Sequence, residues 1–248
     1  MQRSELLQIM DGWLMPERFK DYCPNGLQVE GGATVTRIVG AVTASQAAVD
    51  YAVSVGAQAL LVHHGWFWRG EEARVIGIKR RRLGALLAHD INLIAYHLPL
   101  DAHPELGNNA CLARLLGLNA RPVADSYLWV GELEGADQSV ADFAVRVERV
   151  LGRKPLVLGE TARPVVRVAL CSGAAQDELS KAVELGADLY LSGEVSERTT
   201  HEARENGIAY LSAGHHATER FGVQALLERL DGLQAGLETL FFDDENPV

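Results

Sequence analysis

The sequence predicts an α/β protein made of two similar halves. Short apolar runs alternate along the chain with longer segments in which apolar residues recur at helical spacing, which is the pattern of alternating strands and helices. One stretch of the first half matches a stretch that begins 130 residues later. Histidines and carboxylates follow the expected strands of both halves, which predicts a site shared between them.

Caps and stops mark most of the expected elements. Residues 36–43 (TRIVGAVT) predict a buried strand, and Ser45–Val55 predicts a helix that Gly56 ends. Residues 59–62 predict a second short strand, which runs directly into His63-His64. Residues 118–136 are mixed in composition and carry no assignment. Further helices are expected at 4–15, 80–89, 108–116 and 140–151, and a further strand is expected at 92–98.

The internal match covers a strand, a helix, a Gly-Ala pair and a second strand. At an offset of 130, nine of the 27 positions from 35 to 61 are identical to their counterparts. Farther along, residues 94–96 (Ile-Ala-Tyr) match residues 208–210 at an offset of 114. We therefore expect two halves, 1–125 and 126–248, related by a pseudo-two-fold axis and intertwined into one compact unit, with right-handed crossovers.

The composition argues against several classes of protein. A chain of 248 residues can bury a substantial core, and its formal charge of −10 disfavours general nucleic-acid binding because an acidic surface repels phosphates. No apolar stretch has the length of a membrane span, and the N-terminus lacks a signal-peptide pattern. Cys23, Cys111 and Cys171 form no disulfide framework or metal motif, so we expect a reducing, cytoplasmic location.

The candidate site residues follow equivalent strands of the repeat. Ligands of α/β proteins gather beyond the carboxyl ends of strands, so this agreement predicts one site formed by both halves. Core histidines scattered by chance would not be expected to obey the repeat. The opposed positions are His63-His64 with Gly193-Glu194 at the offset of 130, and Asp101 with His215 and Glu105 with Glu219 at the offset of 114.

The residue types fit a pair of divalent metal ions. Imidazole nitrogens and carboxylate oxygens bind borderline metals such as Zn, Fe or Mn. On a regular strand His63 and His64 would point to opposite faces, but at a strand end both can turn toward one cleft. Asp101, expected on an exposed turn, can bridge two ions with its two oxygens. His215 and Glu219 lie four apart at the start of an expected helix, which places both on one face.

Each of these residues also has an ordinary structural explanation. A single internal histidine is more often a hydrogen-bonded core residue than a ligand, and the His-x-x-x-Glu spacing is common on exposed helices. The doublet of His63 and His64 favours a site, since an apolar strand gains nothing from ending in two imidazoles. His216 is expected beside the site, and the reversed assignment of His215 and His216 stays open. His103 is expected to be solvated.

Several segments in combination resemble one known family. The likeness spans nearly the whole chain, from about Ser4 to Asp244, and is weakest at 118–164. The chain is similar to the short bacterial form of the Nif-three-like family, also catalogued as GTP cyclohydrolase 1 type 2 homologues. The segments that carry the resemblance are DYCPNGLQVEG (21–31), LLVHHGWFW (60–68), HLPLDAHPELGNNACLARLLG (97–117), SGEVSE (192–197) and AGHHATERFG (213–222).

The resemblance implies a duplicated Nif-three-like α/β fold with the metal site between its two halves. It also implies a ring-shaped homohexamer, a trimer of dimers, with metal sites that face an internal cavity. His97 matches a family position near the metals. The dinuclear site that the family implies is carried here by His63, His64, Asp101, His215 and Glu219.

Two functions stay open after this comparison. The first is a metal-dependent hydrolase of purine nucleotides or related heterocycles, in which hydroxide attacks a ring carbon and His97 or Glu194 moves protons. The second is a non-catalytic metal-binding, regulatory or adaptor protein. Five ligands over two ions leave open positions, which favours catalysis. The run Arg80-Arg81-Arg82 is expected to be a solvated helix face rather than a phosphate contact.

A redox site with two irons is a third, less supported idea, since such sites usually carry more glutamates in Glu-x-x-His motifs. The chain has no serine nucleophile elbow, no P-loop and no dinucleotide-binding motif.

Overall fold

The computed structural model describes residues 1–135, 138–233 and 235–248 as a mixed α/β protein, which confirms the expected fold class. The chain forms two compact units. Unit 1 comprises Met1–His103 and Gly222–Glu245, and unit 2 comprises Pro104–Phe221 and Asn246–Val248. Among the described residues, none of the helices has both the length and the apolar character needed to cross a membrane.

Unit 1 is built on a five-stranded sheet in the order β1–β4–β3–β2–β13. β4, β3, β2 and β13 run parallel to one another, whereas β1 is antiparallel to β4. The central strands are almost entirely apolar and buried, as expected where both faces of a parallel sheet are covered. The strands are β1 (Gly26–Val29), β2 (Arg37–Thr43), β3 (Ala59–His64), β4 (Asn92–Ala95) and β13 (Glu238–Phe241).

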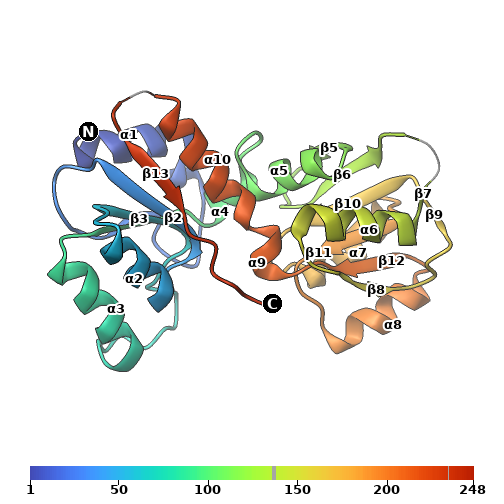
Figure 1. Ribbon diagram of the computed structural model, residues 1–248. Helices are drawn as coiled ribbons and strands as arrows, with labels where there is room; N and C mark the ends of the chain where they lie inside the picture. Colours follow the sequence, from blue (N-terminus) through green and yellow to red (C-terminus); the bar gives the residue numbers. More distant parts are fainter. Residues whose placement is uncertain (136–137, 234) are drawn as a thin grey trace. The chain divides into compact units, whose positions relative to one another are not determined.

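Helices cover both faces of this sheet (Figure 1). α2 and α3 pack on the face that includes Val39, Leu60 and Leu93. α10 packs on the opposite face at Gly40, where a Cβ atom would lie only 2.6 Å from Leu227 Cδ1. The helices around the sheet are α1 (Arg3–Leu14), α2 (Gln46–Ser54), α3 (Gly77–Ala88), α4 (Leu98–Ala102) and α10 (Arg220–Asp231), with the 3₁₀ turn η1 (Pro16–Arg18).

Unit 2 is built on a six-stranded sheet in the order β5–β6–β10–β11–β12–β8. β10, β11 and β12 are parallel, and the remaining pairs are antiparallel. Its strands are β5 (Leu118–Pro122), β6 (Trp129–Leu133), β8 (Leu156–Leu158), β10 (Arg167–Cys171), β11 (Leu189–Ser192) and β12 (Ala209–Ser212), and β7 (Gln138–Ser139) pairs separately with β9 (Pro164–Val165).

The helices of unit 2 also cover both faces of their sheet. α5 and α6 pack against Leu170 and Leu191, and α7 and α8 pack on the other face against Tyr190 and Tyr210. The helices are α5 (Asn108–Leu115), α6 (Val140–Leu151), α7 (Leu179–Glu184), α8 (Glu197–Glu205) and α9 (His215–Thr218), with the 3₁₀ turn η2 (Gln176–Glu178).

The two units divide the chain differently from the expected halves 1–125 and 126–248. Residues 104–125 lie in unit 2, where α5 contributes to its core and β5 pairs with β6. Residues 222–245 lie in unit 1, where β13 pairs with β2. The repeat locates the two βαβ segments, but it contains no information on which sheet the connecting and terminal segments join.

The two sheets share a strand register as well as a strand order. Val39 pairs with Leu60 between β2 and β3, and Ala169 pairs with Tyr190 between β10 and β11. The offset of 130 therefore holds for both strands of each pair. The geometry is consistent with an internal duplication.

In both units one side chain accepts hydrogen bonds from the backbone N–H groups at the start of the repeat's first strand. Gln58 Oε1 accepts hydrogen bonds from the backbone N–H groups of Thr36 and Arg37, at 3.0 and 2.9 Å. Asp188 Oδ2, 130 residues later, accepts from the backbone N–H groups of the two equivalent residues, at 3.0 and 2.9 Å. The backbone N–H groups at the start of a strand need hydrogen-bond partners, and both units supply them from the turn before the next strand.

The third strand follows an offset of 117 instead of 114. Leu60 pairs with Leu93 between β3 and β4, and Tyr190 pairs with Tyr210 between β11 and β12, so Leu93 corresponds to Tyr210. The Ile-Ala-Tyr match is therefore wrong by three residues, because hydrogen-bond register rather than side-chain identity decides which positions are equivalent. With the corrected offset, Asp101 corresponds to Thr218 and not to His215.

Three elements near the candidate site also differ from expectation. The strand expected at 92–98 ends at Ala95, and the next residues form helix α4, so Asp101 lies in a short helix with Pro99 in its first turn. β3 continues through His64 instead of ending at Val62. The helix expected to begin at His215 is interrupted at Glu219, which lies between α9 and α10.

Gly31 provides a test of the packing in unit 1. A Cβ atom at this position would lie 2.3 Å from the backbone oxygen of Asp90, which cannot rotate away. We expect Gly31→Ala to lower the free energy of unfolding by about 1–3 kcal/mol, measured by urea denaturation. The control is Gly84→Ala in α3, where no atom lies within 4 Å of the added Cβ. It should raise stability by up to about 1 kcal/mol, because alanine is the better helix former. Equal stability of the two variants would contradict this packing.

Candidate metal centre

The first donor group of unit 1 lies at the carboxyl end of β3. The rings of His63 and His64 lie 4.5 Å apart, measured between centroids, although consecutive strand residues usually point to opposite faces. His63 Nδ1 lies 3.0 Å from Tyr96 O, and His64 Nδ1 lies 3.3 Å from Thr43 Oγ1. These contacts engage Nδ1 of both rings, so Nε2 is the atom suited to bind a metal.

His97 joins the two neighbouring histidines. Its ring centroid lies 5.1 Å from that of His63 and 5.7 Å from that of His64. Each of the three residues offers a ligand nitrogen, and these atoms all lie within 4.8 Å of one another. β4 ends two residues before His97 and runs parallel to β3, so the two strand ends bring the three imidazoles together. His97 was expected only as a proton-transfer group or a neighbour of the metals. It is instead one of three clustered histidines, His63, His64 and His97, which together are called the imidazole group below.

Asp21 orients His97. Asp21 Oδ1 lies 2.7 Å from His97 Nδ1, and its other oxygen accepts hydrogen bonds from Asn25 Nδ2 and from the backbone N–H of Leu98. Burial on its own would raise the pKa of Asp21, but the hydrogen bonds from His97 and Asn25 outweigh it and lower the pKa to about 2. A carboxylate behind a histidine fixes its ring and tautomer in many metal sites.

Asp21 has no recognisable signal in the sequence. It lies 76 residues before His97, in the segment 21–31, which the sequence marks by its family resemblance and a Pro-Asn-Gly turn but by nothing that points to Asp21 itself. Cys23 lies close enough to His97 and Asp21 to share a metal with them. However, burial, with a contribution from the charge of Asp21, raises the pKa of the Cys23 thiol to about 12.

Asp101 completes the donors of unit 1. Its Oδ1 lies 3.5 Å from His63 Nε2. The short helix α4 holds it there, with the backbone N–H of Asp101 donating to His97 O at 3.2 Å. A carboxylate and imidazoles at this spacing form a donor set that suits Zn²⁺, Fe²⁺ or Mn²⁺.

The donors of unit 2 lie after β12. His215 Nε2 lies 3.0 Å from Glu219 Oε2, so the pair meets although the helix between them is interrupted. On the other side of the ring, His215 Nδ1 lies 2.6 Å from Glu194 Oε1. Burial on its own would lower the pKa of His215, but the carboxylates of Glu219 and Glu194 outweigh it and raise the pKa to about 9. His216, the alternative to His215, is buried and donates its backbone N–H to Val248 O.

Two of the three glycines at the strand ends of unit 2, Gly173 and Gly193, leave room for this pair. Gly173, Gly193 and Gly214 follow the ends of β10, β11 and β12. A Cβ atom on Gly173 would lie 2.1 Å from Glu219 Oε1, and one on Gly193 would lie 2.7 Å from the Cα atom of His215. Gly173 also has a φ of +66°, which few side-chain-bearing residues adopt. The absence of side chains here is a steric requirement of the His215–Glu219 pair.

The corrected register shows how the two units differ. The three glycines correspond to Thr43, His63 and His97, and Glu194 corresponds to His64. In unit 1 the strand ends themselves carry the imidazoles. In unit 2 glycines stand at the positions of His63 and His97, Glu194 stands at that of His64, and the donors come from the segment that follows the third strand.

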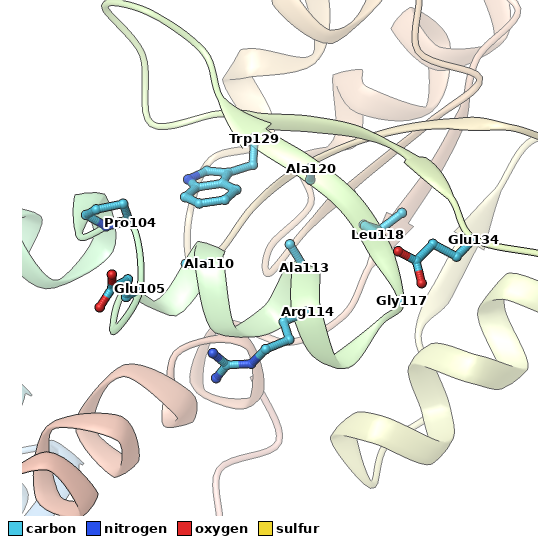
Figure 2. Close-up of a pocket in the computed structure, with 10 residues that line it drawn as sticks. All are labelled: Pro104, Glu105, Ala110, Ala113, Arg114, Gly117, Leu118, Ala120, Trp129 and Glu134. Atoms are coloured by element: carbon cyan, nitrogen blue, oxygen red, sulfur yellow. The ribbon is translucent and has the colours of Figure 1, made fainter.

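Glu105, for which either a place beside the site or simple exposure was expected, is exposed and belongs to unit 2. It lines a cavity of about 400 Å³ whose other walls include Arg114, Trp129 and Glu134 (Figure 2). Small residues of α5 and β5, Ala110 and Ala120 among them, form part of its lining. None of the predicted metal ligands lines this cavity.

The pair of His215 and Glu194 predicts a pH effect in the metal-free protein. Because the pKa of folded His215 is above its ordinary value of 6.5, the pair stabilises the fold fully below pH 6.5 and loses this effect as the pH rises through about 9. Glu194→Gln should lower the His215 titration midpoint, measured by NMR of the ring C–H. Glu197→Gln, which removes the exposed partner of His201, is the control and should leave it unchanged. A wild-type midpoint near 6.5 would contradict the pairing.

Comparisons with known proteins agree with the fold. A family model described as Duf34/NIF3 (NGG1p interacting factor 3) matches residues 1–247. A curated relative from Pseudomonas aeruginosa, named GTP cyclohydrolase 1 type 2 homolog, is 51% identical over 250 residues, which cover 99% of this chain and 98% of the relative.

Two solved structures match this chain over its full length and over their own full length. One, described as protein ybgI of unknown function, is 49% identical with a TM-score of 0.96. The other, TTHA1606 from Thermus thermophilus, is 38% identical with a TM-score of 0.91. The chain therefore belongs to the Duf34/NIF3 (NGG1p interacting factor 3) family.

Proposed function

We propose that His63, His64, Asp101, His215 and Glu219 together hold two divalent metal ions, and that the protein uses them to hydrolyse a purine nucleotide or related heterocycle. The observation that carries the proposal is the oriented donor set of each unit. Three imidazoles of unit 1 offer nitrogens within 4.8 Å of one another, and Asp21 fixes one of them. In unit 2, Glu194 fixes His215 and the glycines leave space for Glu219.

The donors suit hydrolysis better than simple metal storage. Imidazole and carboxylate ligands leave coordination positions for water and substrate, as in hydrolytic metal sites. A divalent ion held by them supplies hydroxide near neutral pH. Hydrolytic opening of the heterocycle then adds the elements of water across one ring C–N bond.

The remaining polar residues have distinct roles in this proposal. His97 is the proton-transfer group, because Asp21 engages its Nδ1 and leaves Nε2 on the side of the imidazole group. Glu194 is a positioning residue, because it contacts His215 Nδ1 and so keeps the opposite nitrogen directed at the metal.

The substrate class is supported by the names of the relatives. The Pseudomonas aeruginosa protein is named GTP cyclohydrolase 1 type 2 homolog. Guanine nucleotides are therefore the first substrates to examine. The homohexamer and the cytoplasmic location stay predictions of the sequence.

Metal binding can be tested without altering any donor. In Gly173→Ala the new Cβ would displace the Glu219 carboxylate, so we expect metal affinity to fall by about 10- to 100-fold, as for disruption of the groups around a site. The control is Gly186→Ala, which has a similar φ of +70° but no atom within 4 Å of the added Cβ. Metal content by mass spectrometry and affinity by competition with a chelator are the measurements. Equal affinity in both variants would contradict the assignment of Glu219.

Catalysis is tested by incubating the metal-loaded protein with GTP and related nucleotides. We expect ring-opened product, detected by absorbance and mass spectrometry, and we expect turnover to drop to background in His63→Ala/His64→Ala. Two bound metals with no turnover above that double variant would overturn the hydrolase proposal. Metals that exchange slowly and have no water-accessible position would then favour the non-catalytic metal-binding or adaptor function.

A further inference from the structure

We infer that Tyr22 and Trp68 form an aromatic wall beside the imidazole group and stack a planar heterocycle there, which makes them specificity-determining residues. The inference rests on the proposed function, since it names the groups of unit 1 that would recognise the substrate ring. Neither residue is among the predicted metal donors.

Both aromatic side chains flank His97. The indole of Trp68 lies 4.9 Å from the His97 ring in an edge-on orientation, and 6.0 Å from the ring of His64. The Tyr22 ring lies 6.3 Å from His97. An aromatic group at these distances from metal donors can cover one face of a ring bound at the metal.

The loop after β3 holds Trp68 in place through its neighbours. Trp66 is buried, with its indole N–H donating to Ala44 O at 3.0 Å and its backbone N–H donating to Gln28 Oε1 at 2.7 Å. Phe67 has a φ of +64°, a strained conformation for a bulky residue that persists where the surroundings determine it. Trp68 then donates its indole N–H to Gly65 O at 3.1 Å.

A second loop is joined to the first and carries Tyr22. The backbone N–H of Arg69 donates to Tyr22 O at 2.7 Å, and the Arg69 guanidinium donates to Asp21 O at 3.1 Å. The same guanidinium lies 5.9 Å from the centre of the Tyr22 ring. The carboxylate that orients His97 and the ring of Tyr22 therefore belong to one hydrogen-bonded structure with the Trp68 loop.

The exposure of Tyr22 and Trp68 favours a binding role over a role in packing alone. Trp66, which anchors the loop, is 7% exposed, whereas Tyr22 is 58% exposed and Trp68 is half-buried. Burial of an aromatic ring is what stabilises a core, so the exposed part of a ring beside metal donors contributes little to folding. Stacking on a planar base is the use that fits its position, because every heterocycle presents a π face.

The test compares a ligand that can stack with one that cannot. Guanosine 5′-monophosphate and ribose 5-phosphate are titrated into the full-length, metal-loaded protein by calorimetry. We expect Trp68→Ala and Tyr22→Ala each to weaken binding of the nucleotide by at least about fivefold, the lower end of the usual loss of a base–aromatic stack. Ribose 5-phosphate should bind with unchanged affinity, and Trp68→Phe should recover most of the nucleotide binding.

Trp13→Ala is the matched control, since Trp13 is a half-buried tryptophan of α1 that lies beside Arg229 instead of the imidazole group. It should leave nucleotide binding unchanged. Metal content is measured in every variant and should equal that of the wild type. Wild-type nucleotide affinity in Trp68→Ala, or an equal loss for both ligands, would overturn the inference. Failure of the proposed function would show instead as absent metal or absent turnover in the wild type.

Discussion

Parallel pairing of three consecutive strands is the constraint on which the donor group in each unit depends. Hydrogen bonding fixes neighbouring strands about 4.8 Å apart, so residues that follow their carboxyl ends start at roughly that separation. In unit 1 this brings the ring of His97 to within 5.1 Å of the His63 ring and 5.7 Å of the His64 ring, measured between centroids. These distances suit donors that share a metal. The apolar strands thus set the spacing of the site, and their burial is what holds that spacing.

The strands of the two units pair in the same way, but different residues stand at their carboxyl ends. In unit 1 the imidazoles belong to residues at the strand ends, and contacts with Tyr96 O, Thr43 and Asp21 orient them. In unit 2 the positions equivalent to His63 and His97 are glycines, and the donors follow the third strand. Both units therefore offer imidazole and carboxylate donors, but from different positions relative to their strands.

The sequence predicted the parts of the fold that depend on local patterns. The helix expected at 140–151 has these bounds in the structure, because Ser139 and Asp142 form a capping box and Gly152 ends it in the left-handed conformation. The strands around His63 follow from uninterrupted apolar runs. The offset of 117 for the third strand could not be predicted. Strand register is set by backbone hydrogen bonds, and matching side chains in two segments do not show which residues pair.

The sequence likewise predicted some residues of the candidate site and not others. His63, His64, His215 and Glu219 stand out in the sequence because they are clustered along the chain. Asp21 does not, because its contact with His97 joins residues 76 positions apart. The role of Gly173 was equally hidden, since a glycine after a strand usually marks a turn, and only the position of the Glu219 carboxylate shows that a side chain cannot fit.

The path of the chain between the units has a consequence for biosynthesis. Residues 104–221 of unit 2 are continuous, whereas the edge strand β13 of unit 1 pairs with β2, from which it is separated by about 200 residues, as in the ion pair of Arg37 with Glu238. During synthesis from the N-terminus, all the strands of unit 2 are therefore available before unit 1 can complete its sheet. One edge of β2 therefore has no strand to pair with while residues 104–221 of unit 2 are made. That interval is the time at which a chaperone, or the corresponding strand of a second nascent chain, has access to the open edge.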